Sequence, residues 1–318
     1  MDRLSSGVVS GGQDAVTGSA IPLNASHEEL IDNAKVRLAV PEALLHLREL
    51  DVLYNGEQKA VWTFMRPHAR PSFTPSMLSD FEVWQQQIGQ HFGPTGVPLD
   101  YLILGSRAPG VFCFGGDLEL FDRLIREGDR AGLAQYGYRC VEILHRNMNA
   151  LDLPMLTIGL VQGQALGGGF EALLSFDVII AEKGSIFGLP EIMFGLFPGM
   201  GAHAILSRKL GTARAEQMIH SNKSYTAEEL HKLGIVTELA EPGCGVDAVR
   251  GFIARSSRRH VGLVNARRAM RRAAPIELSE LRAIVDLWAE TALQLSELDL
   301  KLMRRLAGAQ VRLHCSAA

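Results

Sequence analysis

The stretch from residue 155 to residue 201 constrains the fold more than any other part of the chain. It begins with an aliphatic run, 155–161, that predicts a buried β-strand. Three consecutive glycines, 167–169, follow, and a helix-forming segment then starts at Phe170. A strand that turns through glycines into a helix leaves backbone N–H groups without partners at the helix N-terminus. Such groups can bind an oxygen anion.

Two glutamates accompany the glycines. Glu171 falls in the first turn of the predicted helix, and Glu191 follows a short apolar strand at 185–189. A second glycine-rich turn, 197–201, closes the stretch. Two carboxylates beside an oxyanion site favour acid–base chemistry on a carbonyl compound. Each is also compatible with a structural role, on a helix surface or near a helix N-terminus, but their spacing and the apolar neighbours of Glu171 favour catalysis.

These motifs resemble those of the enoyl-CoA hydratase (crotonase) superfamily. The pattern G-x-A-L-G-G-G-x-E occupies 163–171, L-P-E ends at Glu191, and P-G-x-G occupies 198–201. The segment 112–118 is similar to the F-x-x-G-x-D-L loop of that family. The resemblance extends over about 48–312, and the motifs are specific in combination.

The resemblance implies a role for each matching residue. Glu171 and Glu191 are the expected catalytic carboxylates, and the N–H groups of Gly116 and Gly168 are the expected oxyanion hole. The residues expected to contact the substrate are Leu166, Gly167, Gly199, Met200 and Trp288. Of these, Gly199 matches the glycine that holds a water molecule, whereas Leu166, Met200 and Trp288 are equally compatible with core packing. Asp117 is expected to fold its loop so that the N–H of Gly116 points inward.

The same resemblance implies an α/β fold, a crotonase-like ββα spiral core with a C-terminal helical trimerisation region. We expect a disordered tail at 1–25, the core at 26–245 and the helical region at 246–318. Relatives usually assemble through their C-terminal helices, so a homotrimer or hexamer is expected. No metal or organic cofactor is implied.

A narrower similarity points to one branch of the superfamily. Segments 114–130, 167–172, 197–201 and 287–294 look like the enzymes that synthesise diffusible signal factors, which are bacterial cis-2-unsaturated fatty acids. Members of this branch dehydrate a 3-hydroxyacyl group on acyl carrier protein and then hydrolyse the thioester. The proline-rich loop 66–75 also favours this branch, because ordinary hydratases begin a helix there.

An RNA-binding role is known in the wider family but has no support from the charge balance of this chain. Two further alternatives remain at this point. The chain is also compatible with an ordinary enoyl-CoA hydratase or isomerase, which would take an acyl-CoA instead of an acyl carrier protein thioester. It is further compatible with a non-catalytic binding module, since some relatives bind the receiver domain of a sensor kinase. A non-catalytic member would be expected to lose one glutamate or the glycines, and this chain keeps both.

Composition excludes several other classes. A net charge of −3 over 318 residues gives no general attraction to nucleic acid or to anionic membranes. The four cysteines lie far apart without C-x-x-C spacing, which argues against a disulfide framework and a zinc site. No apolar run reaches the roughly 18 residues of a membrane helix. No signal peptide is evident, so we expect the cytoplasm.

The remaining periodicities predict the order of elements. Alternating apolar residues within 49–65 predict a β-hairpin, and Ser76 is expected to cap the helix that follows the proline-rich loop. Thr226 with Glu229 predicts a capping box. Other segments are assigned as follows: a short helix after Ser26, strands at 101–104, 177–181 and 235–239, and helices at about 118–127, 131–149, 202–210 and 213–219.

Overall fold

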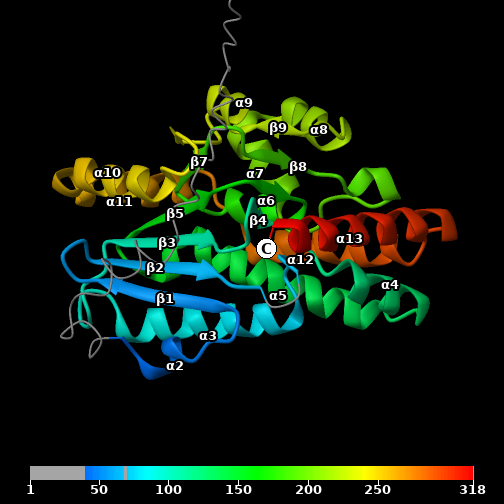
Figure 1. Ribbon diagram of the computed structural model, residues 1–318, viewed down its shortest axis with the longest axis horizontal. Helices are drawn as coiled ribbons and strands as arrows, with labels where there is room; N and C mark the ends of the chain where they lie inside the picture. Colours follow the sequence, from blue (N-terminus) through cyan, green and yellow to red (C-terminus); the bar gives the residue numbers. More distant parts are fainter. Residues whose placement is uncertain (1–39, 68–69, 318) are drawn as a thin grey trace, which may run out of the picture.

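The structure is a computed structural model that describes residues 40–67 and 70–317, with side chains as far as residue 308 (Figure 1). The expected tail at 1–25 and the expected helix after Ser26 lie outside the described residues. Everything that follows concerns the described part of the chain.

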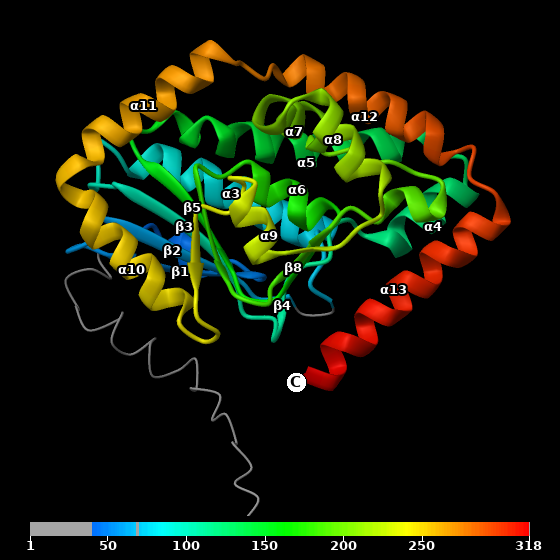
Figure 2. The same ribbon diagram turned by 90° about the horizontal axis from the view of Figure 1, so that it is seen from above.

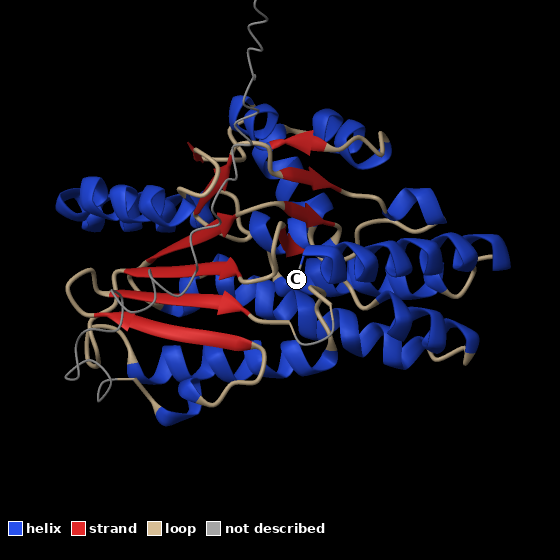
Figure 3. Cartoon of the chain, in the orientation of Figure 1, coloured by secondary structure: helices blue, strands red, loops and turns tan. Residues whose placement is uncertain are grey.

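A six-stranded sheet forms the centre of the fold (Figure 3). Its strands, in spatial order, are β1 (Leu50–Asn55), β2 (Ala60–Met65), β3 (Tyr101–Ser106), β5 (Leu156–Val161), β7 (Val178–Glu182) and β10 (Glu238–Ala240). The predicted hairpin is confirmed, because β1 and β2 pair antiparallel. All other neighbours in this sheet are parallel.

The central strands of this sheet are buried on both faces, which explains why β3 and β5 read as nearly continuous apolar runs. In β3, Leu102 and Leu104 face one hydrophobic cluster, which includes side chains of α3 (Pro75–His91) and α5 (Arg130–Met148). Tyr101 and Ile103 face a second cluster together with Val249 and Ile253 of α10 (Gly245–Ser256). The period of two along the strand therefore divides its side chains between two cores.

A smaller sheet lies beside the first and carries the loops that matter for function. Its order is β4 (Val111–Cys113), β6 (Gln164–Leu166), β8 (Ile186–Gly188) and β9 (Tyr225–Thr226). The chain passes from β5 of the large sheet to β6 of the small one, and β6 leads directly into α6 (Gly168–Leu174). The sequence predicted the strand near β8, because the mostly apolar segment 185–189 contains it, but it did not predict the other three strands.

The other helices surround the two sheets (Figure 2). They are α2 (Glu42–Leu45), α4 (Leu118–Arg126), α7 (Ala202–Leu210), α8 (Thr212–His220), α9 (Ala227–Lys232), α11 (His260–Ala273), α12 (Leu278–Ala292) and α13 (Glu297–Ala317), with 3₁₀ turns at Ala150–Asp152, Glu191–Phe194 and Ser257–Arg259. The C-terminal region is helical as expected. None of the helices in the described ranges combines the length and the apolar character needed to cross a membrane.

Two boundaries differ from the sequence prediction. The cap of α3 is Thr74, whose side chain accepts a hydrogen bond from the N–H of Met77, and Ser76 lies inside the helix. Pro75 then occupies the first helical position, where its missing N–H costs nothing. The strand predicted at 235–239 begins only at Glu238. The predicted capping box is confirmed at Thr226 and Glu229.

Truncation of Leu102 tests the position of the core. Leu102 has no exposed surface, so Leu102→Ala is expected to lower the free energy of unfolding by about 3 kcal/mol. Leu45 is 53% exposed, so the control Leu45→Ala should change it by less than about 0.5 kcal/mol. Urea denaturation followed by circular dichroism measures both. Equal losses would contradict the assignment of β3 to the centre of the sheet.

Candidate functional site

One cavity of about 180 Å³ brings together every residue that the sequence assigned to a site. Its lining includes the two glutamates, the two expected oxyanion glycines and the five expected substrate contacts: Glu171, Glu191, Gly116, Gly168, Leu166, Gly167, Gly199, Met200 and Trp288. These residues come from the loop before α4, from the β6–α6 turn, from the segment before α7 and from α12. Segments far apart in the sequence therefore converge on one space.

The two glycine-rich loops approach each other closely. Gly115 has φ +92°, and a Cβ on it would lie 2.5 Å from the backbone nitrogen of Gly168. A Cβ on Gly168 would lie 3.5 Å from the backbone nitrogen of Gly116. The N–H groups of Gly116 and Gly168 are consequently neighbours, and position 115 cannot carry a side chain without moving one of the loops.

Local hydrogen bonds fix the peptide that precedes Gly168. The carbonyl of Gly167 accepts from the N–H groups of Phe170 and Glu171, at 2.9 and 3.0 Å, in the first turn of α6. The N–H of Gly168 belongs to the same planar peptide and points in the opposite direction. Within the described residues, the N–H groups of Gly116 and Gly168 make no backbone hydrogen bond. They are therefore available to a ligand oxygen.

Glu171 is fully buried on α6, at 1% exposure. One of its carboxylate oxygens, Oε1, accepts from the N–H of Met200 at 2.9 Å and from the N–H of Ala202 at 3.0 Å. Burial raises the pKa of Glu171 to about 7, although these two hydrogen bonds favour the ionised form and lower it. The carboxyl group can therefore change its protonation state near neutral pH.

Glu191 sits at the start of the 3₁₀ turn that follows β8. The residue as a whole is partly exposed, but its Oε2 is buried and has no hydrogen-bond partner among the described residues. Burial, and then the charge of Glu171, raise the pKa of Glu191 well above its usual range. A Cβ on Gly167 would lie 2.7 Å from Oε1 of Glu191, so glycine at 167 makes room for this carboxylate beside the N-terminus of α6.

The two carboxyl groups interact, because the charge of one raises the pKa of the other. Such a pair loses its protons in two steps that belong to the pair. Over a pH range that begins near 7, it holds a single proton. One acidic and one basic carboxyl beside two free N–H donors can remove a proton next to a thioester carbonyl while protonating a leaving group.

A second, narrower cavity of about 60 Å³ adjoins the first, with which it shares Gly116, Gly168 and Met200. Its walls are almost wholly apolar and come from α3, α5 and α6, with Phe81, Trp84 and Leu144 among the lining residues. Cys140 also lines it, and burial raises the pKa of its thiol to about 12, so the thiolate is not populated at neutral pH. The chemistry of these walls suits a hydrocarbon chain.

The aromatic rings of Trp288 and Phe121 pack against Gly199 and Gly116, respectively. Their rings meet edge to face at 5.0 Å. A Cβ on Gly199 would lie 2.6 Å from the indole of Trp288, and one on Gly116 would lie 2.7 Å from the ring of Phe121. Trp288 is thus a buried core residue that also lines the cavity. Core packing and a position beside the substrate site, the two interpretations of this residue, are therefore compatible.

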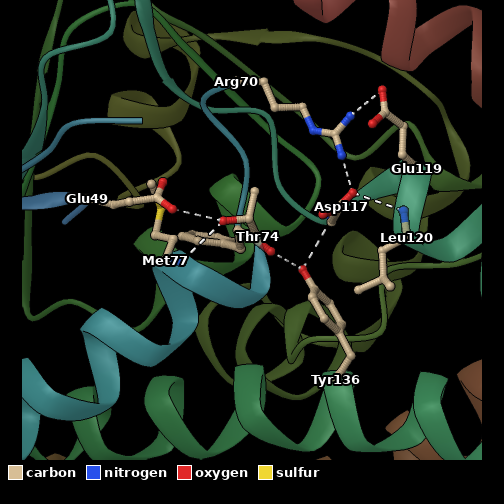
Figure 4. Close-up of polar contacts among 9 residues, drawn as sticks. Glu49, Arg70, Thr74, Met77, Asp117, Glu119, Leu120 and Tyr136 are labelled. Carbon is tan, nitrogen blue, oxygen red and sulfur yellow. Dashed lines mark hydrogen bonds and ion pairs between the residues drawn. The ribbon is translucent and has the colours of Figure 1, made fainter. Parts of the chain in front are cut away.

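The sequence analysis did not identify two polar residues that hold the loop carrying Gly116 (Figure 4). Arg70, 6% exposed, forms ion pairs with Asp117 and Glu119. Tyr136 donates to the carbonyl of Phe73 at 2.6 Å and accepts from the N–H of Asp117 at 3.3 Å. Asp117 also caps α4, because its side chain accepts from the N–H of Leu120.

The chain resembles known proteins over more than half of its length. The sequence model of the enoyl-CoA hydratase/isomerase family matches residues 59–247. A putative enoyl-CoA hydratase/isomerase of Bacillus subtilis (strain 168), YngF, is 30% identical over 188 residues, which cover 59% of this chain and 67% of YngF. The peroxisomal fatty acid β-oxidation multifunctional protein AIM1 of Arabidopsis thaliana is 34% identical over 134 residues, 42% of this chain but only 18% of AIM1.

Solved structures share the fold. Pseudomonas aeruginosa DspI superimposes with a TM-score of 0.62 at 23% identity, covering 72% of this chain and 88% of DspI. An enoyl-CoA hydratase from Bacillus halodurans gives a TM-score of 0.67 at 18% identity, over 80% of this chain and 98% of the hydratase. With the family model spanning more than half of its residues, the chain belongs to the enoyl-CoA hydratase/isomerase (crotonase) family.

Proposed function

We propose that this protein makes a cis-2-unsaturated fatty acid signal from a 3-hydroxyacyl thioester of acyl carrier protein, by dehydration and then thioester hydrolysis. The observation that carries the proposal is the convergence of Glu171, Glu191, Gly116 and Gly168 on one cavity. Burial raises the pKa of both carboxyl groups, so that the pair can supply one acid and one base there. The narrower match to the signal-synthase branch supplies the product class, and the apolar second cavity is suited to the acyl chain.

In the dehydration step, the thioester oxygen lies between the N–H groups of Gly116 and Gly168. One carboxylate takes the C2 proton, and the negative charge that develops on the oxygen is stabilised by the two donors, typically by about 3–4 kcal/mol for each. The other carboxyl group protonates the C3 hydroxyl, which leaves as water while the C2–C3 double bond forms. The pair ends the step with the same number of protons with which it began.

In the hydrolysis step, water adds to C1 and the C–S bond breaks. A carboxylate of the same pair takes a proton from the attacking water and then gives that proton to the departing sulfur, so the carrier leaves as a thiol and the pair regains its starting state. The tetrahedral intermediate places its oxyanion between the same two N–H groups. The chain contains no G-x-S-x-G motif, so a carboxylate-activated water is the proposed nucleophile.

An ordinary enoyl-CoA hydratase is the second candidate, and the family comparison favours it. The relatives named above include enoyl-CoA hydratases, and the same two carboxyl groups would serve hydration of an enoyl-CoA. The two functions differ in the product: a free cis-2-enoic acid in one case and a trans-2-enoyl-CoA in equilibrium with its hydrated form in the other.

Product analysis separates these candidates. The purified protein is incubated with 3-hydroxyacyl carrier protein and, in parallel, with the matching CoA ester. We expect free cis-2-enoic acid from the carrier-protein thioester, identified by mass spectrometry and by chromatography against both isomers. A trans-2-enoyl-CoA without free acid would assign the protein to the hydratases instead, and the absence of any product would favour a binding module.

The two glutamates are tested by isosteric substitution. Glu171→Gln and Glu191→Gln should each lower the rate of dehydration by at least about 10³-fold, because each removes one member of the acid–base pair. Exchange of the C2 proton of a saturated acyl thioester in D₂O, followed by NMR, identifies the base as the glutamate whose substitution abolishes exchange. Full dehydration activity in either variant would contradict the assignment.

The shared proton also predicts the pH dependence of kcat for dehydration. Below about pH 7 both carboxyls are protonated and no base is present, so kcat should rise as pH increases through about 7. At higher pH Glu191 loses its proton, the acid disappears and kcat should fall again. Rates measured from pH 5 to pH 10 check this. A profile that is flat across this range would show that the pair does not share its proton as proposed.

Gly115→Ala tests the oxyanion hole without touching a carboxyl group. The new methyl group would displace the N–H of Gly168, so kcat should fall about 10²- to 10³-fold, the usual cost of losing one donor. Gly110→Ala is the matched control. Gly110 also has a positive φ, +67°, but no atom lies within 4 Å of its added Cβ, so backbone strain alone acts there. Equal effects in the two variants would contradict the role of Gly168.

A further inference from the structure

The segment 70–74 runs beside the loop that carries Gly116. The N–H of Phe114 donates to the carbonyl of Pro71 at 2.7 Å, and the N–H of Phe73 donates to the carbonyl of Gly115 at 2.8 Å. Phe73 and Gly116 form an isolated parallel bridge. By its sequence this region is a proline-rich loop, where ordinary hydratases begin a helix. In the structure it is a backbone partner of the proposed oxyanion site.

The hydrogen bond from Phe73 acts on the peptide that carries a proposed donor. The carbonyl of Gly115 and the N–H of Gly116 belong to one planar trans peptide, so they point in opposite directions. A partner that holds the carbonyl therefore also sets the direction of the N–H. Accepting a hydrogen bond at the carbonyl also polarises the peptide and strengthens its N–H as a donor.

The hydroxyl of Tyr136 holds the next peptide along the chain (Figure 4). It accepts from the N–H of Asp117 at 3.3 Å and donates to the carbonyl of Phe73 at 2.6 Å. The carbonyl of Gly115 and the N–H of Asp117 lie on opposite sides of the Cα of Gly116. Both backbone dihedral angles of Gly116 are thus restrained from outside, and a glycine has little restraint of its own.

Arg70 ties the two segments together through its side chain. Its buried guanidinium reaches Asp117 and, at 2.8 Å, Glu119 on the first turn of α4. Asp117 accepts from the N–H of Leu120 with the same oxygen that faces Arg70. A charge buried this deeply is strongly destabilising if its partner moves away, so the loop has one preferred position relative to the segment 70–74.

We propose that Tyr136 and Arg70 are positioning residues of the oxyanion hole, acting through Phe73, Asp117 and the peptides on either side of Gly116. They hold the N–H of Gly116 in the direction that the thioester oxygen requires, so that this donor costs no reorganisation during the reaction. The inference rests on the proposed function, because it takes Gly116 and Gly168 as the groups that bind the carbonyl.

Tyr136→Phe removes only the hydroxyl and keeps the ring that packs on Phe121. The matched control is Tyr54→Phe. Tyr54 is also buried, at 8% exposure against 5% for Tyr136, and also donates to a backbone carbonyl at 2.6 Å, that of Pro98. Tyr54 lies on β1 and does not line either cavity of the site.

The direct measurement is the infrared C=O stretch of a bound saturated acyl thioester labelled with ¹³C at C1. In wild-type protein and in Tyr54→Phe, two aligned donors should move this band to lower wavenumber than in water. In Tyr136→Phe the displacement should be smaller. The same variant should lose kcat by roughly 10- to 100-fold, less than outright loss of a donor, with KM changed by less than about twofold.

Arg70→Lys provides a second variant, since it keeps the charge but loses the planar group that reaches two carboxylates at once. It should reduce the band displacement and kcat in the same direction. Full displacement and full kcat in both variants would overturn the inference and leave the proposed function standing. Equal losses of kcat in Tyr136→Phe and Tyr54→Phe would show that the loss comes from lowered stability of the fold, and would also overturn the inference.

The spectroscopic measurement also separates this inference from the proposed function, because the saturated thioester cannot be dehydrated. If the wild-type protein displaces the band but forms no cis-2-enoic acid from the carrier-protein substrate, the proposed function is contradicted. A smaller displacement in Tyr136→Phe would still establish that Tyr136 positions the donor. No displacement in wild-type protein would overturn both, since the carbonyl would then lie elsewhere.

Discussion

The close approach of two backbone segments, 115–116 and 167–168, is the contact on which the site depends. A side chain on Gly115 would reach the nitrogen of Gly168, so the approach requires glycine there. The carbonyl group of each of these two peptides accepts a hydrogen bond that fixes the peptide. The carbonyl of Gly115 accepts from Phe73, and the carbonyl of Gly167 accepts from the first turn of α6. The donors are therefore directed before any substrate binds, which is what makes such groups effective in catalysis.

Burying the two glutamates beside these loops is electrostatically unfavourable. Two carboxyl groups buried near each other cannot both ionise without a large electrostatic penalty. Two backbone N–H groups offset part of the penalty at Glu171. Oε2 of Glu191 has no donor among the described residues, and its raised pKa means that the penalty is avoided by retaining a proton. Destabilising features of this kind concentrate at functional sites and are supported by the surrounding core.

Much of the fold follows from local sequence patterns. The hairpin, the strands of the large sheet and the positions of α4, α5, α7 and α8 were predicted to within a few residues, because long periodic segments carry a clear signal. The cap of α3 was predicted at Ser76 and lies at Thr74, since both residues can accept the capping bond and only the position of Pro75 distinguishes them. The strands β4, β6 and β9 are too short to show a period and form only because neighbouring segments pair with them.

The sequence by itself identified the glycines and the two glutamates as site residues. Their residue types are required locally, by a positive φ, by a close backbone approach or by the need for a carboxyl group. It also placed all nine expected site residues, which line one cavity. Only the tertiary structure decided what surrounds them. Asp117 lies 47 residues from Arg70 along the chain, and Phe73 lies 63 residues from Tyr136. Burial raises the pKa of both glutamates, and their environments differ because two backbone N–H groups bond Glu171 while the charge of Glu171 acts on Glu191. Burial and long-range pairing are properties of the packed chain, and no local pattern of residues encodes them.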